Sequence, residues 1–299
     1  MKILLFGKNG QLGWELQRSL AVLGELVALG TDSTDYCGDF TDLDGIAKTI
    51  QSIGPDVIVN AAAYTAVDKA ESEPELARMI NVAAPRVLAI EAKRLGAWLI
   101  HYSTDYVFDG TAGKPWKETD RTNPLSVYGK TKLDGEQVII DAECMHLIFR
   151  TSWVFASRGA NFVKTMLRLA AERDQLNVIN DQFGAPTGAD LLADVTSHCL
   201  QQAMLHPELG GLYHLAAGGT TTWYDYARCA IEFARHAGKN IKVERESIKP
   251  IPTSSYPTPA VHPLNSRLDT FKLRSTFNLT LPDWQIGVRR MLTEISENK

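Results

Sequence analysis

Several features that mark specialised classes of protein are missing from this sequence. No apolar run approaches the roughly 20 residues that a membrane-spanning helix needs. The first apolar stretch is also too short for the hydrophobic region of a secretory signal. The four cysteines are scattered and form no Cys-x-x-Cys pair, which favours a reducing compartment over a secreted disulfide framework. We therefore expect a cytoplasmic protein without a membrane partner.

Basic clusters and histidine metal motifs are absent as well. The 299 residues carry a formal net charge of −4 and their basic side chains form no long run, which argues against a nucleic-acid partner. The seven histidines form no His-Glu-x-x-His motif, so a catalytic metal is not expected. Hydrophobic residues make up 44% of the chain and charged residues 22%, as in ordinary globular proteins.

What is present is an alternation of short apolar strands with helical stretches, which is typical of parallel α/β proteins. It predicts strands at residues 3–6, 26–29, 57–61, 97–102 and 147–150, and helices at 11–23, 43–53 and 75–95, the last bent at Pro85. The second half predicts helices near 162–172, 189–205, 223–237 and 284–296, strands near 176–180 and 211–216, and an extended proline-rich loop at 249–263.

The pattern predicts an α/β fold with a doubly wound, Rossmann-like parallel sheet and a second, smaller mixed α/β substrate lobe. Residues 1–150, with a returning segment at about 185–218, would form a dinucleotide-binding domain. Residues 151–184 and 219–299 would form the substrate domain. The strand at 211–216 could then rejoin the main sheet.

A glycine-rich loop follows the first predicted strand and opens the first predicted helix. Gly7, Gly10 and Gly13 have the spacing G-x-x-G-x-x-G. Glycines at such a junction allow a tight turn and let backbone N–H groups approach a pyrophosphate, which the helix N-terminus also attracts. We predict a dinucleotide site here, with Gln11 and Leu12 as further contacts.

Two later segments fit strand ends that line the same cleft. Asp39 could accept a hydrogen bond from an adenine amine while Phe40 packs on the ring, although Asp39 could instead cap the turn before helix 43–53. Small residues after strand 57–61 would let the backbone pass close to a flat cofactor. Contacts are predicted there from Ala62, Ala63, Tyr64 and Thr65.

The choice between NADH and NADPH stays open at the sequence level. Asp32 or Asp35 could bind the ribose hydroxyls of NADH, whereas Lys8 could favour the 2′-phosphate of NADPH. Use of both cofactors is the expectation.

Tyr128 and Lys132 stand four residues apart. If their segment is helical, both side chains lie on one face. An ammonium about 4 Å from the phenol would lower the tyrosine pKa from its usual value of about 10 by up to about three units. Such a tyrosine could act as general acid or base beside a carbonyl or alcohol. The spacing alone fits a surface helix with a solvated lysine equally well.

Taken together, these motifs resemble the extended branch of the short-chain dehydrogenase/reductase superfamily. The resemblance rests on the glycine loop, the strand end at residues 60–62, Thr104, and the Tyr128/Lys132 pair. More narrowly, the chain resembles the dTDP-4-dehydrorhamnose reductase family through STDYVFDG (103–110), RTSWVF (150–155), DQFGAPT (181–187) and PLNSRLD (263–269). This implies NAD(P)H-dependent reduction of the 4-keto group of dTDP-4-dehydro-L-rhamnose to dTDP-L-rhamnose, a precursor of cell-surface sugars such as O-antigen.

The resemblance also implies roles for individual residues. Tyr128 would donate the proton, Lys132 would lower its pKa and bind the nicotinamide ribose, and Thr104 would orient the ketone. Asn81 matches the proton-relay asparagine of the superfamily, although an asparagine at a helix start is ordinarily a cap.

Five further residues are candidates for substrate binding. Asp105 follows Thr104 at the strand end, and Trp153 could stack on the sugar or the thymine or belong to the core. Asn161 and Gln182 could contact the diphosphate or base, or instead form turns. Arg267 could bind the diphosphate or make a surface salt bridge.

Other functions of the same fold stay open. Dehydratases place a glutamate after the aspartate of this motif, and here Tyr106 stands there instead, which disfavours dehydration. A nucleotide-sugar epimerase with tightly bound NAD, or a non-catalytic subunit like the regulatory subunit of methionine adenosyltransferase, would share most of these residues. The resemblance further implies a homodimer and a structural magnesium ion, whose ligands the sequence leaves unknown.

Overall fold

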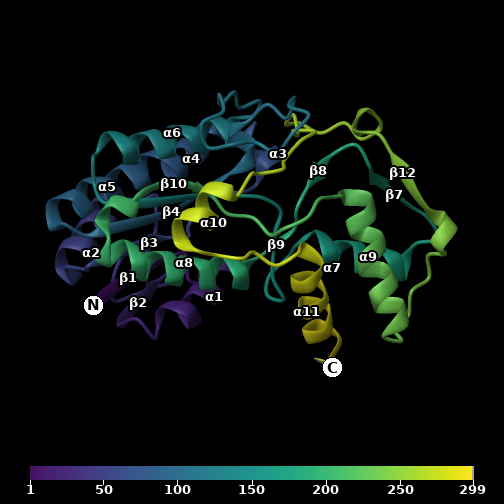
Figure 1. Ribbon diagram of the computed structural model, residues 1–299, viewed down its shortest axis with the longest axis horizontal. Helices are drawn as coiled ribbons and strands as arrows, with labels where there is room; N and C mark the ends of the chain where they lie inside the picture. Colours follow the sequence, from purple (N-terminus) through teal and green to yellow (C-terminus); the bar gives the residue numbers. More distant parts are fainter. Residues whose placement is uncertain (298–299) are drawn as a thin grey trace.

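A six-stranded sheet forms the centre of the computed structural model, which describes residues 1–297 (Figure 1). The strand order is β10-β5-β4-β3-β1-β2, and every neighbouring pair is parallel. The strands are β1 (Lys2–Phe6), β2 (Glu25–Leu29), β3 (Val57–Asn60), β4 (Trp98–Thr104), β5 (His146–Thr151) and β10 (Gly211–His214). The predicted return of the 211–216 strand to the main sheet is therefore confirmed.

Helices cover both faces of this sheet. Side chains of a strand alternate between faces, so Leu5 joins the core beneath α1 (Gln11–Leu20), α8 (Ala189–Leu205) and α10 (Phe271–Phe277). Leu4 joins the opposite core beneath α2 (Leu43–Ile53), α5 (Ala84–Leu95) and α6 (Val127–Asp141). In Figure 1 α5 and α6 lie on one side of the strands and α1 and α8 on the other. The predicted doubly wound α/β fold is confirmed.

The strand order creates a crevice at the carboxyl ends of β1 and β3. The chain leaves β1 for β2 on one side and later returns to β3 on the other side of β1. Phe6 and Asn60, the last residues of these two strands, are register partners. Ligands of open parallel sheets bind at such a reversal of strand order. The glycine loop begins here.

The helical region before β4 is less regular than predicted. It divides into α4 (Pro74–Arg78), a π-helical turn (Met79–Ala83) and α5, preceded by the short α3 (Val67–Ala70). Pro85 follows the π-helical turn directly, because α5 continues from it without a break. The irregularity of this region is therefore a π-helical turn just before Pro85, and the predicted bend at Pro85 stays a prediction.

The second half of the chain also forms a separate lobe, at the right of Figure 1. Its helices are α7 (Phe162–Glu172), α9 (Trp223–His236) and α11 (Trp284–Glu297), and its parallel strand pair is β7 (Leu176–Ile179) with β12 (Ile248–Ile251). The proline-rich loop prediction is thus wrong at its start, because Pro250 lies in β12, in a two-stranded sheet where it need not donate to a neighbour on both sides. The exact domain boundaries stay a prediction.

Several short elements gave no sequence signal. Two-residue strands form the pairs β6 (Val154–Phe155) with β9 (Thr187–Gly188) and β8 (Phe183–Gly184) with β11 (Thr221–Thr222). 3₁₀ turns lie at Asp105–Val107, Pro207–Leu209, Arg245–Ser247 and Thr253–Ser255. Within residues 1–297, no helix combines the length and apolarity required to cross a membrane.

Candidate active site

Close packing fixes the start of α6, the helix that carries Tyr128 and Lys132. Ser126 caps it by accepting a hydrogen bond from the Gly129 N–H at 3.1 Å. A Cβ on Gly129 would collide with the Tyr106 carbonyl oxygen, and one on Gly135 would collide with that of Asn81. These two glycines let the helix lie directly against the strand-end turn and the π-helical turn. The helix assumed for the pair is confirmed, and its i, i+4 spacing puts both side chains on one face.

Lys132 is buried, with 2% of its surface exposed. Its Nζ donates to the Tyr102 carbonyl oxygen at 2.7 Å and lies 3.2 Å from His101 Nε2. Burial lowers the pKa of Lys132 to about 8, and the Glu136 carboxylate opposes that shift. The ammonium is therefore still the main form at pH 7, but only by a modest margin.

Tyr128 does not have the acidic phenol that the sequence predicts. Burial raises the pKa of Tyr128 to about 12, an interaction with the Thr104 hydroxyl lowers it, and the Asp105 charge raises it further. A lowering of this pKa by Lys132 is wrong for this arrangement: burial dominates the shift, and the ammonium donates to the Tyr102 carbonyl. The phenol is therefore fully protonated at neutral pH.

Thr104 and Asp105 lie at the end of β4, beside Tyr128. The Thr104 hydroxyl donates to Asp105 Oδ1 at 3.1 Å, and the other carboxylate oxygen has no partner within the described residues. Burial raises the pKa of Asp105 to about 6, against hydrogen bonds from Ser266 and Thr104 that lower it. A buried carboxylate with a free oxygen is able to accept a hydrogen bond from a ligand.

The glycine loop fits the pyrophosphate of a dinucleotide. Gly7 has a φ of +89°, and a Cβ there would lie 2.7 Å from the Ala62 nitrogen. A Cβ on Gly13 would collide with the Gly7 carbonyl oxygen, so both glycines are required by the packing of the chain itself. At Gly10 the nearest atom to such a Cβ is 3.5 Å away, and α1 begins at Gln11 without a side-chain cap. Exposed backbone and uncapped N–H groups therefore meet at Gly10, with Leu12 in the same first turn.

The adenine contacts predicted for Asp39 and Phe40 find little support in the geometry. Asp39 Oδ1 accepts from the N–H and hydroxyl of Thr41 at 2.9 and 2.8 Å, so Asp39 caps the turn before α2, as the alternative interpretation predicts, and Asp42 caps the helix itself. The Phe40 ring is 4% exposed and packs edge-to-face on Phe6 with centroids 5.4 Å apart. Phe40 therefore belongs to the core of the sheet, and its ring presents no open face.

The segment after β3 is held by Asn81. Asn81 Oδ1 accepts from the Tyr64 N–H at 2.9 Å, and its Nδ2 donates to the Tyr64 carbonyl at 3.1 Å and the Thr131 hydroxyl at 3.1 Å. The helix-cap interpretation of Asn81 is therefore wrong, because Asn81 lies within the π-helical turn, while its proton-relay role stays a prediction. Asn81 fixes the backbone at Tyr64, between Ala62, Ala63 and Thr65, against α6.

The two groups that could decide between NADH and NADPH are paired with each other. Lys8 Nζ lies 3.4 Å from Asp32 Oδ1, and Asn9 donates to the same oxygen at 2.9 Å. Both charges lie next to the glycine loop and neither is buried. Either cofactor would have to separate or share this pair.

A cavity of about 670 Å³ lies between the sheet layer and the lobe. Asp68 and Tyr106 line it from the sheet layer, and Phe162, Arg173, Gln182 and Trp223 line it from the lobe. The Tyr106 ring meets the Tyr128 ring edge-to-face, with centroids 5.5 Å apart. The cavity therefore borders the Tyr128 site.

Of the predicted substrate residues in the lobe, Gln182 lines the cavity and Trp153 does not. Gln182 donates to the Thr253 hydroxyl at 3.1 Å and accepts from Trp223 Nε1 at 3.0 Å. The Trp153 indole stacks on Trp223 with centroids 3.6 Å apart, so Trp223 is the tryptophan that faces the cavity. No local pattern distinguishes these two tryptophans in the sequence.

Asn161 and Arg267 have structural partners. Asn161 caps α7 and donates to Gln11 Oε1 at 3.2 Å, which joins the lobe to the glycine loop. Arg267 donates to Asn265 Oδ1 at 2.8 Å and the Gly113 carbonyl at 3.0 Å, and makes no ion pair within the described residues. The arginine at the cavity is Arg173, which the sequence analysis missed because a lone arginine after a helix carries no signal.

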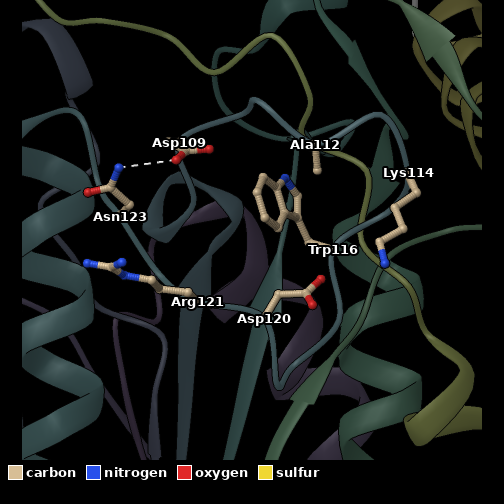
Figure 2. A pocket seen from close by; sticks show the side chains of 7 residues that line it. All are labelled: Asp109, Ala112, Lys114, Trp116, Asp120, Arg121 and Asn123. Atoms are coloured by element: carbon tan, nitrogen blue, oxygen red, sulfur yellow. Dashed lines mark hydrogen bonds between the residues drawn. The ribbon is translucent and has the colours of Figure 1, made fainter.

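A second hollow, of about 370 Å³, lies in the loop between β4 and α6 (Figure 2). Figure 2 shows Trp116 at its centre, Lys114 and Arg121 on opposite sides, and a hydrogen bond of 3.1 Å from Asn123 to Asp109. None of the predicted site residues lines it. Within residues 1–297, no three His, Cys, Asp or Glu side chains are arranged to hold a metal ion, so the expected magnesium gains no support.

Comparison with known proteins places the chain in one group. The family described as RmlD substrate binding domain matches residues 1–297. A curated dTDP-4-dehydrorhamnose reductase from Shigella flexneri is 60% identical over 99% of this chain and 98% of that protein. The crystal structure of a dTDP-4-dehydrorhamnose reductase from Clostridium acetobutylicum has a TM-score of 0.88 at 35% identity and covers 99% of both chains. A dTDP-4-dehydrorhamnose reductase from Bacillus anthracis in complex with NADP has a TM-score of 0.86 at 33% identity, over 98% of this chain and 99% of that chain.

Proposed function

The chain belongs to the RmlD substrate binding domain family, and from that premise we propose that it reduces the 4-keto group of dTDP-4-dehydro-L-rhamnose to give dTDP-L-rhamnose, with NADPH or NADH as the reductant. The relatives that share 60% of its residues are named for this reaction. The observation that carries the proposal is the grouping of Thr104, Tyr128 and Lys132 at one edge of the sheet, beside the cavity and the glycine loop.

Tyr128 is the proposed proton donor. With a pKa of about 12 the phenol is protonated at neutral pH, as a donor must be, and an alkoxide is far more basic than a phenolate. Transfer from Tyr128 to the oxygen of the reduced ketone is therefore favourable. A nicotinamide cofactor, when bound at the glycine loop, would be the source of the hydride for the carbonyl carbon.

Thr104 and Lys132 support that transfer. The Thr104 hydroxyl, which donates to Asp105 in the described structure, would turn to donate to the ketone oxygen and hold it near the phenol. The Lys132 ammonium would bind the nicotinamide ribose. This role is proposed for the charged form of Lys132, so the reaction should slow as the pH rises past about 8.

Substrate recognition is proposed to come from the lobe. Arg173 lines the cavity, whereas Arg267 does not and is bonded to Asn265 and Gly113, so Arg173 is a better candidate for the diphosphate than Arg267. Phe162 and Trp223 offer apolar surface for the base or sugar, and Asp105 offers a free carboxylate oxygen. The roles of Trp153, Asn161 and Gln182 are then to support this surface.

The proposal is tested by following absorbance of the reduced nicotinamide with the purified chain and the 4-keto sugar nucleotide. Net oxidation that matches the sugar alcohol formed is expected. An epimerase would show no net oxidation, and a regulatory subunit would show no turnover without its partner; either result would refute the proposal. Light scattering of the purified chain tests the proposed homodimer. A chelator added to the assay tests whether a magnesium ion is needed.

A further inference from the structure

Three buried polar side chains form a line that ends at the Lys132 amine. Asn60 closes β3, His101 lies opposite it on β4, and Lys132 reaches them from α6. Asn60 Nδ2 lies 3.0 Å from His101 Nδ1, and His101 Nε2 lies 3.2 Å from Lys132 Nζ. All three residues are at most 2% exposed, so water does not provide alternative partners.

Hydrogen-bond accounting fixes the proton on His101. Asn60 Oδ1 accepts from the Ala62 N–H at 3.1 Å, so the amide of Asn60 presents its NH₂ group to His101 Nδ1 and donates to it. Burial first, and the Lys132 charge second, hold the pKa of His101 well below its usual value, so the ring is neutral. A neutral imidazole has one N–H, which must then be on Nε2, facing Lys132.

That tautomer opposes a charged Lys132. An ammonium has only donors, so it cannot accept from the Nε2–H, whereas a neutral amine can. A charged Lys132 could donate to His101 only if the ring proton were on Nδ1 instead of Nε2. The Asn60 amide would then have to turn its oxygen toward Nδ1 and lose its hydrogen bond from the Ala62 N–H. The Tyr102 carbonyl accepts from Nζ in either protonation state.

We propose that His101, with its tautomer set by Asn60, is a positioning residue that controls the protonation of Lys132 and thereby the pH range of the reaction. Its consequence for turnover rests on the proposed function. The titratable groups around Lys132 are His101 on β4 and Glu136 and Tyr128 on α6. Glu136 favours the ammonium and is itself paired with Arg150, so His101 and Glu136 act on Lys132 in opposite directions.

The first test observes His101 directly in the unmodified protein. Nitrogen-15 NMR distinguishes an imidazole protonated on Nε2 from one protonated on Nδ1, and His101→Gln identifies the signal. The Nε2–H tautomer is expected at pH 7 to 8. The Nδ1–H tautomer would overturn the proposal.

The second test follows the titration of Lys132 through its carbon-13 labelled Cε, assigned with Lys132→Met. In His101→Gln the side-chain amide can turn its oxygen toward the ammonium, so the Lys132 midpoint should rise by about one pH unit, and the alkaline limb of kcat should move with it. His146→Gln, on β5 and bonded to the Cys144 carbonyl, is the matched control and should change neither. An unchanged Lys132 midpoint in His101→Gln would sink the inference. Because NMR reads the amine itself, the result holds even if the chain fails to oxidise the nicotinamide.

Discussion

The sheet layer and the lobe hold their polar groups in opposite ways. In the sheet layer, Arg150 and Glu136 form a buried pair with hydrogen bonds of 2.9 and 2.6 Å, and Ser103 bonds to the same carboxylate. On α7 of the lobe, Arg168 and Glu172 form a pair at 3.0 Å that is more than half exposed. Desolvated groups that are hydrogen-bonded to one another hold fixed positions, whereas exposed groups are free to adapt to a ligand.

This difference suggests a division of labour. The proposed proton transfer uses desolvated groups of the sheet layer, Tyr128 and Lys132. Recognition of a charged ligand needs accessible groups, such as Arg173 at the cavity. The lobe is held instead by aromatic packing, in which Trp223 stacks on Trp153 and contacts Phe162 with centroids 4.5 Å apart. We expect variants of the sheet layer to change kcat or stability and variants of the lobe to change KM.

The largest effect is expected for Tyr128→Phe. Loss of the proton donor should lower kcat by about 100- to 10,000-fold, the usual contribution of a general acid. Cofactor binding, followed by fluorescence titration, should stay within about twofold because the change removes one hydroxyl. Tyr213→Phe is the control. Tyr213 lies on β10, at the edge of the sheet, and its hydroxyl donates to the Leu209 carbonyl, so loss of this hydroxyl should leave kcat unchanged. Near-normal turnover of Tyr128→Phe would mean that Tyr128 of the sheet layer does not supply the proton.

The next largest effect concerns stability. Glu136→Ala leaves the buried Arg150 guanidinium without its carboxylate and should lower the free energy of unfolding by about 3–5 kcal/mol. Glu172→Ala breaks the exposed pair on α7 and should cost less than about 1 kcal/mol. Urea denaturation of both variants measures the contrast. Equal losses would mean that burial does not separate the two regions.

How far the sequence predicts these regions depends on whether the signal is local. The glycine loop and the Tyr128/Lys132 pair are local spacings, and α6 and the first turn of α1 place them as expected. The parallel order of the strands follows from the alternation of apolar strands and helices. Packing partners are not local, so neither the burial of Phe40 against Phe6 nor the π-helical turn at Met79–Ala83 could be predicted.

The lobe was less predictable for the same reason. Trp153 and Trp223 are far apart in the chain, and only their stacking decides which one faces the cavity. Arg267 lies in a recognisable motif, whereas Arg173 does not, yet Arg173 lines the cavity. The predicted sign of the Tyr128 pKa shift is wrong because spacing indicates which residue is near but not how far the phenol is desolvated.

A smaller effect, of opposite sign, is expected for Asp105→Asn. The pKa of Asp105 rises from 3.8 to about 6 on folding, so the folded state binds the extra proton between these values and stability falls as the pH rises through that window. The shift of about two units corresponds to about 3 kcal/mol at most. Asparagine removes this cost, so the variant should be more stable than the parent above pH 6 and similar to it below pH 4. Thermal unfolding between pH 4 and pH 8 measures this, and a constant difference across that range would refute it. Activity should fall, because the free carboxylate oxygen is lost.

The smallest effect is expected in the lobe, from Arg173→Met. Removal of one exposed cation at the cavity should raise KM for the sugar nucleotide about 10-fold, equivalent to about 1.4 kcal/mol, since a partly solvated charge pair is worth no more. kcat should be unchanged, because Arg173 does not take part in proton transfer, and the dependence of KM on salt should weaken. Arg168→Met is the matched control. Arg168 lies on α7, the helix that ends just before Arg173. It pairs with Glu172 and does not line the cavity, so its loss should leave KM unaltered. A fall in kcat for Arg173→Met would mean that the lobe takes part in the chemistry itself. An equal rise in KM for both arginine variants would instead point to the general positive charge of α7, and the assignment of recognition to the cavity would then fail.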